Sequence, residues 1–123
     1  MIGKAYTALF KFYDNALQKM SFKKRPILII GKADSNDYVM LPISRVTNSH
    51  NISAEFDLKV EPTAVPLLNL SQISYIRTHK QEIINRAQID KLIVDFKIEY
   101  PDIYIDCLEK VEEFQKRLLS DAL

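Results

Sequence analysis

The sequence predicts a mainly β domain, α+β by content: a small barrel-like sheet of about five or six strands, followed by two helices. Three observations lead to this prediction. The first half of the chain has short segments rich in Tyr, Phe, Ile and Val, separated by turn residues. The second half changes to helical spacing of its apolar residues. A small sheet that avoids open edges curls into a barrel.

The length and charge of the chain limit its organisation. With 123 residues it has room for one hydrophobic core but not for two domains of ordinary size. We therefore expect one domain over residues 1–123, with strands over about 4–84 and helices over about 87–120. The formal net charge of +1 excludes a uniformly basic surface. It still allows a local basic patch, because net charge does not fix where the charges lie.

The expected strands follow from apolar runs and from the residues that end them. Pro26–Ile30 is a solid apolar run, which is typical of a strand buried on both faces. Pro42 cannot donate to a strand ladder, so its strand should lie at an edge or end at a bulge. A polar loop is expected over Asp14–Lys24. The predicted strands are Lys4–Tyr13, Pro26–Ile30, Tyr38–Ile43, Phe56–Val60, Ile73–Thr78 and Gln81–Ile84.

Two helices are expected after the strands. Apolar residues recur at helical spacing from Ile89 to Phe96, and Asn85 is a suitable N-cap. Pro101 fits the first position of a second helix, where its missing N–H has no partner to lose. The apolar face of that helix is predicted to hold Cys107, Leu108, Val111, Phe114 and Leu118.

Several classes of chemistry are excluded by composition. Only two glycines occur, so there is no phosphate-cradling loop and no dinucleotide fingerprint. His50 and His79 lie far apart and Cys107 is the single cysteine, so we expect no metal, no cofactor and a buried, inert thiol. No apolar stretch approaches about 20 residues and no signal-peptide core is present. We therefore expect a cytoplasmic protein without a membrane segment.

Two basic segments indicate a site for phosphate. Lys24 and Arg25 directly precede the apolar run that starts at Pro26, so the strand should aim the planar guanidinium rather than leave it mobile. Ser44 and Arg45 stand at the end of a second predicted strand. The alternatives are a solvated basic loop for the first segment and ordinary turn chemistry for the second.

A third segment, Ser74–Lys80, carries mixed polar groups on a predicted strand. Alternate side chains on a strand share a face, so Tyr75, Arg77 and His79 should point one way and Thr78 the other. An aromatic ring, a cation and an imidazole on one face form a platform for single-stranded nucleic acid. A surface strand without a ligand is the alternative.

The order and content of these segments resemble the PemK/MazF family of toxin–antitoxin ribonucleases. Arg25–Ile30 looks like the family's Arg-Pro and aliphatic strand, and Leu41–Ser44 looks like its strand that ends in a catalytic Thr or Ser. Ile76–Thr78 looks like its Ile-Arg-Thr strand, and Gly3–Tyr6 like its opening strand. The resemblance implies an SH3-like barrel with C-terminal helices. It also implies a homodimer that cleaves single-stranded RNA without metal and is neutralised by a cognate antitoxin.

Site residues follow partly from this resemblance. By position it implies that Arg25 is the catalytic arginine and Ser44 the catalytic hydroxyl. Many members carry an acidic residue or Gln where this chain has Ser74 and Tyr75. His79 is the candidate acid or base near neutral pH. The residues expected to bind RNA are Lys24, Arg45, Tyr75, Arg77 and Thr78. Two alternatives stay open: a non-enzymatic toxin that binds a protein, as in the related gyrase-poisoning toxins, and an SH3-like binding module without an active site.

Overall fold

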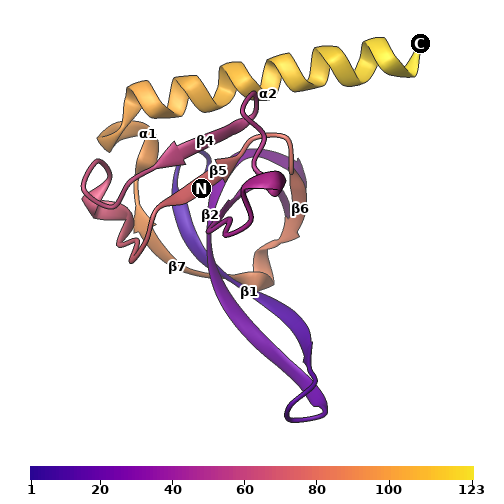
Figure 1. The fold of residues 1–123 in the computed structure, drawn as a ribbon, viewed down its shortest axis with the longest axis vertical. Coiled ribbons are helices and arrows are strands. Elements are labelled where there is room, and N and C mark those ends of the chain that lie inside the picture. Colours follow the sequence, from indigo (N-terminus) through magenta and orange to yellow (C-terminus); the bar gives the residue numbers. More distant parts are fainter.

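The computed structural model describes residues 1–123 as a curled antiparallel sheet with a long helix across one end (Figure 1). Strands hold 42% of the residues and helices 28%, so the predicted mainly β class is confirmed. The strands are β1 (Ala5–Asp14), β2 (Lys19–Asp34), β3 (Asp37–Ser44), β4 (Asp57–Val60), β5 (Ser74–Arg77), β6 (Glu82–Asn85) and β7 (Ile89–Val94). The helices are α1 (Phe96–Glu99) and α2 (Pro101–Ala122), with 3₁₀ turns at Ser49–Asn51, Pro66–Leu68 and Arg86–Gln88.

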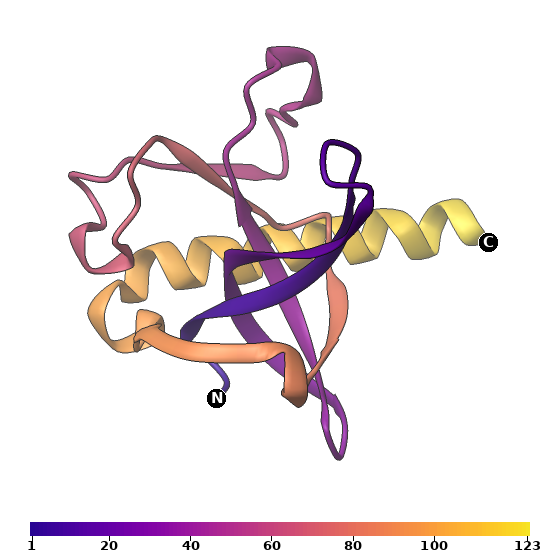
Figure 2. The ribbon, with the colours of Figure 1, turned by 90° about the horizontal axis from the view of Figure 1, so that it is seen from below.

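The strands follow the order β4-β5-β3-β2-β1-β7, and β6 also pairs with β3. This order bends the sheet into a half-barrel, which Figure 2 shows with α2 on its far side. β3 pairs with β6 as far as Met40 and with β5 from Ile43. Pro42 falls between these two pairings. The expectation of an edge strand is therefore wrong, because the proline occupies a gap between two partners of an interior strand.

The polar loop expected over Asp14–Lys24 is mostly strand. β1 and β2 pair continuously from Ala5 opposite Leu28 to Asp14 opposite Lys19, and only four residues turn between them. The resulting hairpin projects from the end of the half-barrel opposite α2 (Figure 1). Aromatic residues of β1 lie opposite the lysine-rich part of β2, and such cross-strand pairs stabilise the two-stranded ribbon. The polar composition of Asp14–Lys24, taken alone, predicted a loop.

The first predicted helix is also a strand. β7 pairs antiparallel with β1, with Val94 opposite Ala5 and Ile89 opposite Ala8. Apolar spacing of three and four residues does not separate a short strand from a helix, and the open edge of β1 decides in favour of the strand. Asn85 does cap a helical turn, the short Arg86–Gln88 turn, through a capping box with Gln88. The second predicted helix is confirmed as α2, with Pro101 in its first turn.

The core lies on both faces of β2. Leu28 packs in a larger cluster with Phe96 and with Cys107 of α2. Ile27 and Ile29 pack on the other face, in a smaller cluster. The prediction that Pro26–Ile30 is buried on both faces is confirmed for its central residues, each of which is 0% exposed. Neither helix is long and apolar enough to cross a membrane.

Candidate functional site

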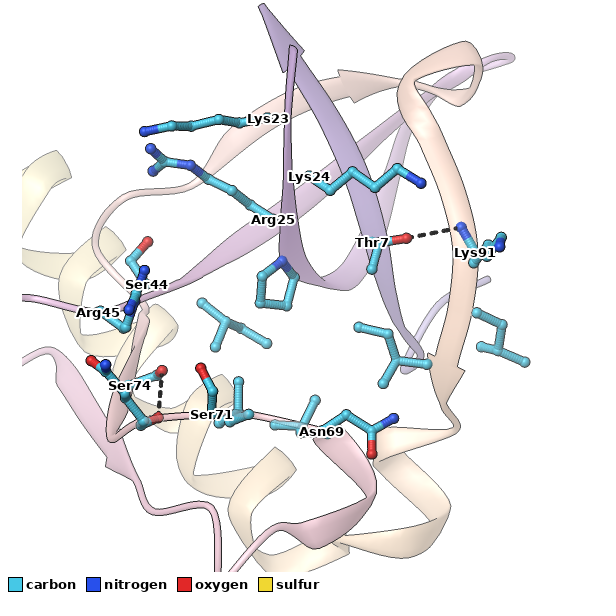
Figure 3. A pocket seen from close by; sticks show the side chains of 17 residues that line it. Thr7, Lys23, Lys24, Arg25, Ser44, Arg45, Asn69, Ser71, Ser74 and Lys91 are labelled. Atoms are coloured by element: carbon cyan, nitrogen blue, oxygen red, sulfur yellow. Dashed lines mark hydrogen bonds between the residues drawn. The ribbon is translucent and has the colours of Figure 1, made fainter.

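A main groove of about 670 Å³ runs beside β2 and β7 (Figure 3). Its lining comes from residue 7 of β1, residues 23–26 of β2, residues 43–45 at the end of β3, residues 68–72 and 74 before and in β5, and residues 91–93 of β7. No lining residue is Asp or Glu. The five cations of the main groove are Lys23, Lys24, Arg25, Arg45 and Lys91.

A side groove of about 420 Å³ adjoins the main groove and shares Arg25, Ser44 and Arg45 with it. It adds the side chains of Arg77, His79 and Lys80, with residues 46–48 and 51, and again no Asp or Glu. The two grooves together hold seven of the chain's seventeen Lys and Arg residues and none of its sixteen acidic residues. Five of these seven cations make no ion pair within the protein, which gives the grooves a positive field that favours a polyanion.

Arg25 and Ser44 lie where the grooves meet. Both also line a third cavity of about 200 Å³, and no other residue lines all three spaces. The Arg25 side chain is exposed and makes no hydrogen bond or ion pair within the protein, so its five N–H donors are free for a ligand. The sequence placed these two residues on separate strands, and the fold brings them to one point.

β2 fixes the position of Arg25. The residue lies inside the strand, opposite the buried Ala8 of β1, and not before the strand as the sequence indicated. Alternation sends the neighbouring Lys24 to the other face, where its Nζ lies 3.2 Å from the Asp90 carboxylate. Figure 3 shows Lys24 pointing toward Thr7, away from Arg25. The hydrogen bond from Lys24 holds the pKa of Asp90 below its usual value, so Lys24 lines the groove with its charge already paired.

Arg77 is anchored inside the protein. Its Nε and one Nη donate to the fully buried carboxylate of Asp57 at 3.0 and 3.2 Å. The same Nη donates to the Asn51 carbonyl at 2.7 Å, and the backbone N–H of Ser53 donates to Asp57 at 2.8 Å. Most of the N–H donors of Arg77 are therefore used in hydrogen bonds within the protein, while its side chain borders the side groove.

His79 also borders the side groove, with its imidazole only 16% exposed. Its Nδ1 lies 3.8 Å from an Asp57 oxygen and, although buried, has no hydrogen-bond partner. The ring packs against Phe56 and against Phe114 of α2. Burial lowers the pKa of His79 below its ordinary value, and Asp57 opposes that shift while Arg77 adds to it. The imidazole is therefore neutral near pH 7 and able to accept a proton.

The predicted alternation along β5 is confirmed, but two expected RNA-binding residues lie outside the grooves. Thr78 is fully buried and its hydroxyl donates to the Phe56 carbonyl, so it supports the fold and cannot reach a ligand. Tyr75 lies between β3 and β4, opposite Ser44 and Lys59, and lines neither groove. An outward position on a strand does not decide which neighbouring cavity a side chain enters.

Two residues of the site were not predicted from the sequence: Lys91, which lines the main groove, and Asp57, which holds Arg77. Lys91 was not predicted as a groove residue because its segment, which is β7 in the structure, was expected to be a helix. Asp57 was not predicted because it shares the polar positions of the alternating run Phe56–Val60 with Lys59; it is buried in the structure, where its register partner is Arg77. A carboxylate at a buried strand position calls for a cationic neighbour.

The fold and these grooves define a small half-barrel domain with a basic, carboxylate-free groove. No group of three or more His, Cys, Asp or Glu side chains converges as a metal ion would require. Cys107 is buried, and burial raises the pKa of its thiol to about 12. No protein-family model matches the chain, and no curated protein matches it.

Proposed function

We propose that this protein is a metal-independent endoribonuclease that cleaves single-stranded RNA, and the toxin of a toxin–antitoxin pair. The observation that carries the proposal is the convergence of Arg25 and Ser44 at the junction of two grooves that hold seven cations and no acid. These are the two residues that the resemblance to PemK/MazF toxins implies as catalytic. The proposal includes a cytoplasmic location, where an RNA substrate is found.

Single-stranded RNA fits the shape and charge of the site. Lysine and arginine side chains along a groove neutralise successive phosphates, and a single strand can follow a bent groove that a stiff duplex cannot. Arg45 directly follows β3 and Lys91 lies on β7, and both line the main groove. An RNA strand that passes Arg25 therefore meets further cations. Lys24 adds a donor that Asp90 holds in place.

The chemistry uses the 2′-hydroxyl of the substrate as the nucleophile. Its oxygen forms a bond to phosphorus while the bond from phosphorus to the 5′ oxygen breaks. Arg25 stabilises the charge that develops on the non-bridging oxygens, and it is not a base because guanidinium stays protonated. Ser44 donates a hydrogen bond to the same phosphate. His79, neutral and at the side groove, accepts the proton of the 2′-hydroxyl. The leaving 5′ oxygen takes a proton from water, so the products are a 2′,3′-cyclic phosphate and a 5′-hydroxyl.

The proposal extends to two partners, a second copy of the chain and an antitoxin. Large apolar side chains stand exposed along the projecting hairpin, among them Tyr13, Met20 and Phe22, and support a homodimer. Sedimentation should therefore show a dimer at micromolar concentration, and a stable 14.3 kDa monomer would contradict it. An antitoxin segment with acidic residues would complement the basic groove.

The test is direct cleavage. Purified protein is incubated with a long single-stranded RNA in excess EDTA, beside the same RNA annealed to its complement, and the ends are mapped. We expect cuts in the single strand at a short recurring sequence, with cyclic phosphate and 5′-hydroxyl ends. Cleavage that EDTA abolishes and magnesium restores would overturn the mechanism. An intact RNA would overturn the enzymatic function and favour the non-enzymatic toxin.

A further inference from the structure

The third cavity, of about 200 Å³, lies at the root of the projecting hairpin and adjoins Arg25 and Ser44. Directly opposed residues of an antiparallel pair share a face, and the register sets Ala8 opposite Arg25 and Phe10 opposite Lys23. Phe12, two residues beyond Phe10, is on that face as well. The cavity thus continues the Arg25 site along an aromatic surface.

The walls of this cavity suit one flat ring. Phe10, Phe12 and Pro42 line it, with Ile27 and Met40 of the smaller core cluster. An engineered cavity of about 150 Å³ holds one benzene ring, so this one has room for a single nucleobase but not for a base pair. The Lys23 Nζ lies over one face of the Phe12 ring, 5.1 Å from its centroid, so a cation borders the cavity at this ring.

Glu82 distinguishes this cavity from both grooves. It is the one acidic residue that lines any of the three spaces, and it makes no hydrogen bond or ion pair within the protein. It reaches the cavity from β6, where it pairs with Met40 of β3. A free carboxylate repels phosphate, but it accepts hydrogen bonds from the edge of a base. Guanine offers two adjacent donors, N1–H and the N2 amino group, to the two carboxylate oxygens.

We propose that this cavity is a nucleobase pocket that holds one unpaired guanine of the RNA, stacked on Phe12 and bonded through its edge to Glu82. The inference rests on the proposed function and adds to it a residue that selects the sequence. It places the guanine next to the phosphate that Arg25 binds, because Arg25 and Ser44 line both spaces. Uracil presents one N–H between two carbonyl oxygens that the carboxylate would repel, so it is the poorest occupant.

Binding can be measured without cleavage. The probes are uniformly 2′-O-methylated oligouridylates with one central guanosine, one inosine or no substitution, because 2′-O-methyl RNA has no nucleophile. Inosine lacks the N2 amino group alone. We expect the guanosine probe to bind wild type about tenfold more tightly than the inosine probe, and Glu82→Gln to remove that difference. Phe12→Leu should weaken binding of the guanosine probe about tenfold, since the stacking surface is lost while the side chain stays apolar. Glu61→Gln, an exposed acid outside the cavities, is the control, with thermal melting to confirm folding.

The two proposals fail separately. Equal affinity of wild type for all three probes would overturn the guanine pocket, whatever the cleavage assay shows. Cut sites without a preferred guanine, or an unchanged preference in an active Glu82→Gln enzyme, would overturn the pocket and leave the ribonuclease intact. A guanosine preference that Glu82→Gln removes, in a protein that cuts no RNA, would support the pocket and reject the catalytic function.

Discussion

The Arg77 guanidinium donates two hydrogen bonds to the Asp57 carboxylate across the β4–β5 pair, at 3.0 and 3.2 Å. The Asp57 side chain is fully buried and that of Arg77 is 18% exposed. Asp57 also lies 3.8 Å from the His79 imidazole, so one carboxylate organises the two side chains that border the side groove. The proposed site around Arg25 therefore adjoins a groove whose bordering side chains are held by a residue that does not line it.

Replacing Asp57 should destabilise the protein strongly. Asp57→Asn keeps the shape but leaves Arg77 without its ionic partner, and breaking a buried pair in this way costs about 3 kcal/mol. Glu61→Gln is a matched control, because Glu61 faces Lys59 at 3.8 Å with both side chains 54% exposed. That exposed pair should contribute less than about 1 kcal/mol. Urea unfolding measures both, and equal losses for the two variants would contradict the structural role of Asp57.

The second prediction concerns pH. Burial lowers the pKa of His79 in the folded protein below its ordinary value of 6.5, against an opposing effect of Asp57 and with Arg77, Lys80 and Arg117 adding to the shift. At pH values between the pKa of His79 in the folded protein and 6.5, the imidazole is protonated in the unfolded chain but neutral in the folded protein. The contribution of His79 to stability is therefore fully present above pH 6.5 and is lost as the pH falls below it.

His79→Gln tests this sign, because glutamine does not titrate in that range. Urea unfolding at pH 7.5 and at pH 5.5 should show wild type losing more stability on acidification than the variant. An equal or smaller loss in wild type would mean that the imidazole charges freely in the folded state. The same variant tests catalysis: loss of a general base should lower the cleavage rate about 10²–10⁴-fold.

The parts of the fold that the sequence predicted are those where burial dictates residue type. Pro26–Ile30 has no polar side chain to present to water, so its burial on two faces follows from composition alone. Pro101 marks the start of α2 because proline fits a first helical turn and little else nearby. Both signals are local, and neither needs a partner strand.

The wrong predictions of secondary structure share one cause: the structure of each segment is set by the strand that it pairs with, which the local sequence does not show. Ile89–Val94 becomes a strand because β1 offers an open edge, and Lys19–Arg25 becomes a strand because the aromatic residues of β1 lie opposite. At the site, Arg25 and Ser44 were predicted as separate motifs, but which groove each enters is set by the bend of the sheet. The burial of Thr78 and the Asp57–Arg77 pair are likewise properties of register.

Cys107 should be inert in the folded protein. It is 0% exposed, and burial, with the nearby Asp106 adding to it, raises the pKa of the thiol to about 12. A buried, protonated thiol neither reaches nor attacks an aromatic disulfide reagent. We expect no reaction in native buffer and one equivalent of released chromophore in denaturant. Cys107→Ser should leave RNA cleavage at the wild-type rate if the variant folds, and a loss of activity in a folded variant would bring the thiol into the mechanism.

The last prediction separates the role of Arg25 in the reaction from any role in the fold. Arg25→Ala removes an exposed side chain that has no partner in the protein, so its melting temperature should match that of Lys32→Ala, a control on the same strand. Cleavage should fall about 10²–10³-fold, because a preorganised donor to the phosphate is lost. Arg25→Lys should recover only part of the rate, since an ammonium lacks the planar fork that binds two phosphate oxygens. Ser44→Ala should show the same separation of rate from stability. If a folded Arg25→Ala protein cuts RNA as fast as wild type, the convergence of Arg25 and Ser44 does not mark the reaction centre, and the phosphate is bound elsewhere along the main groove.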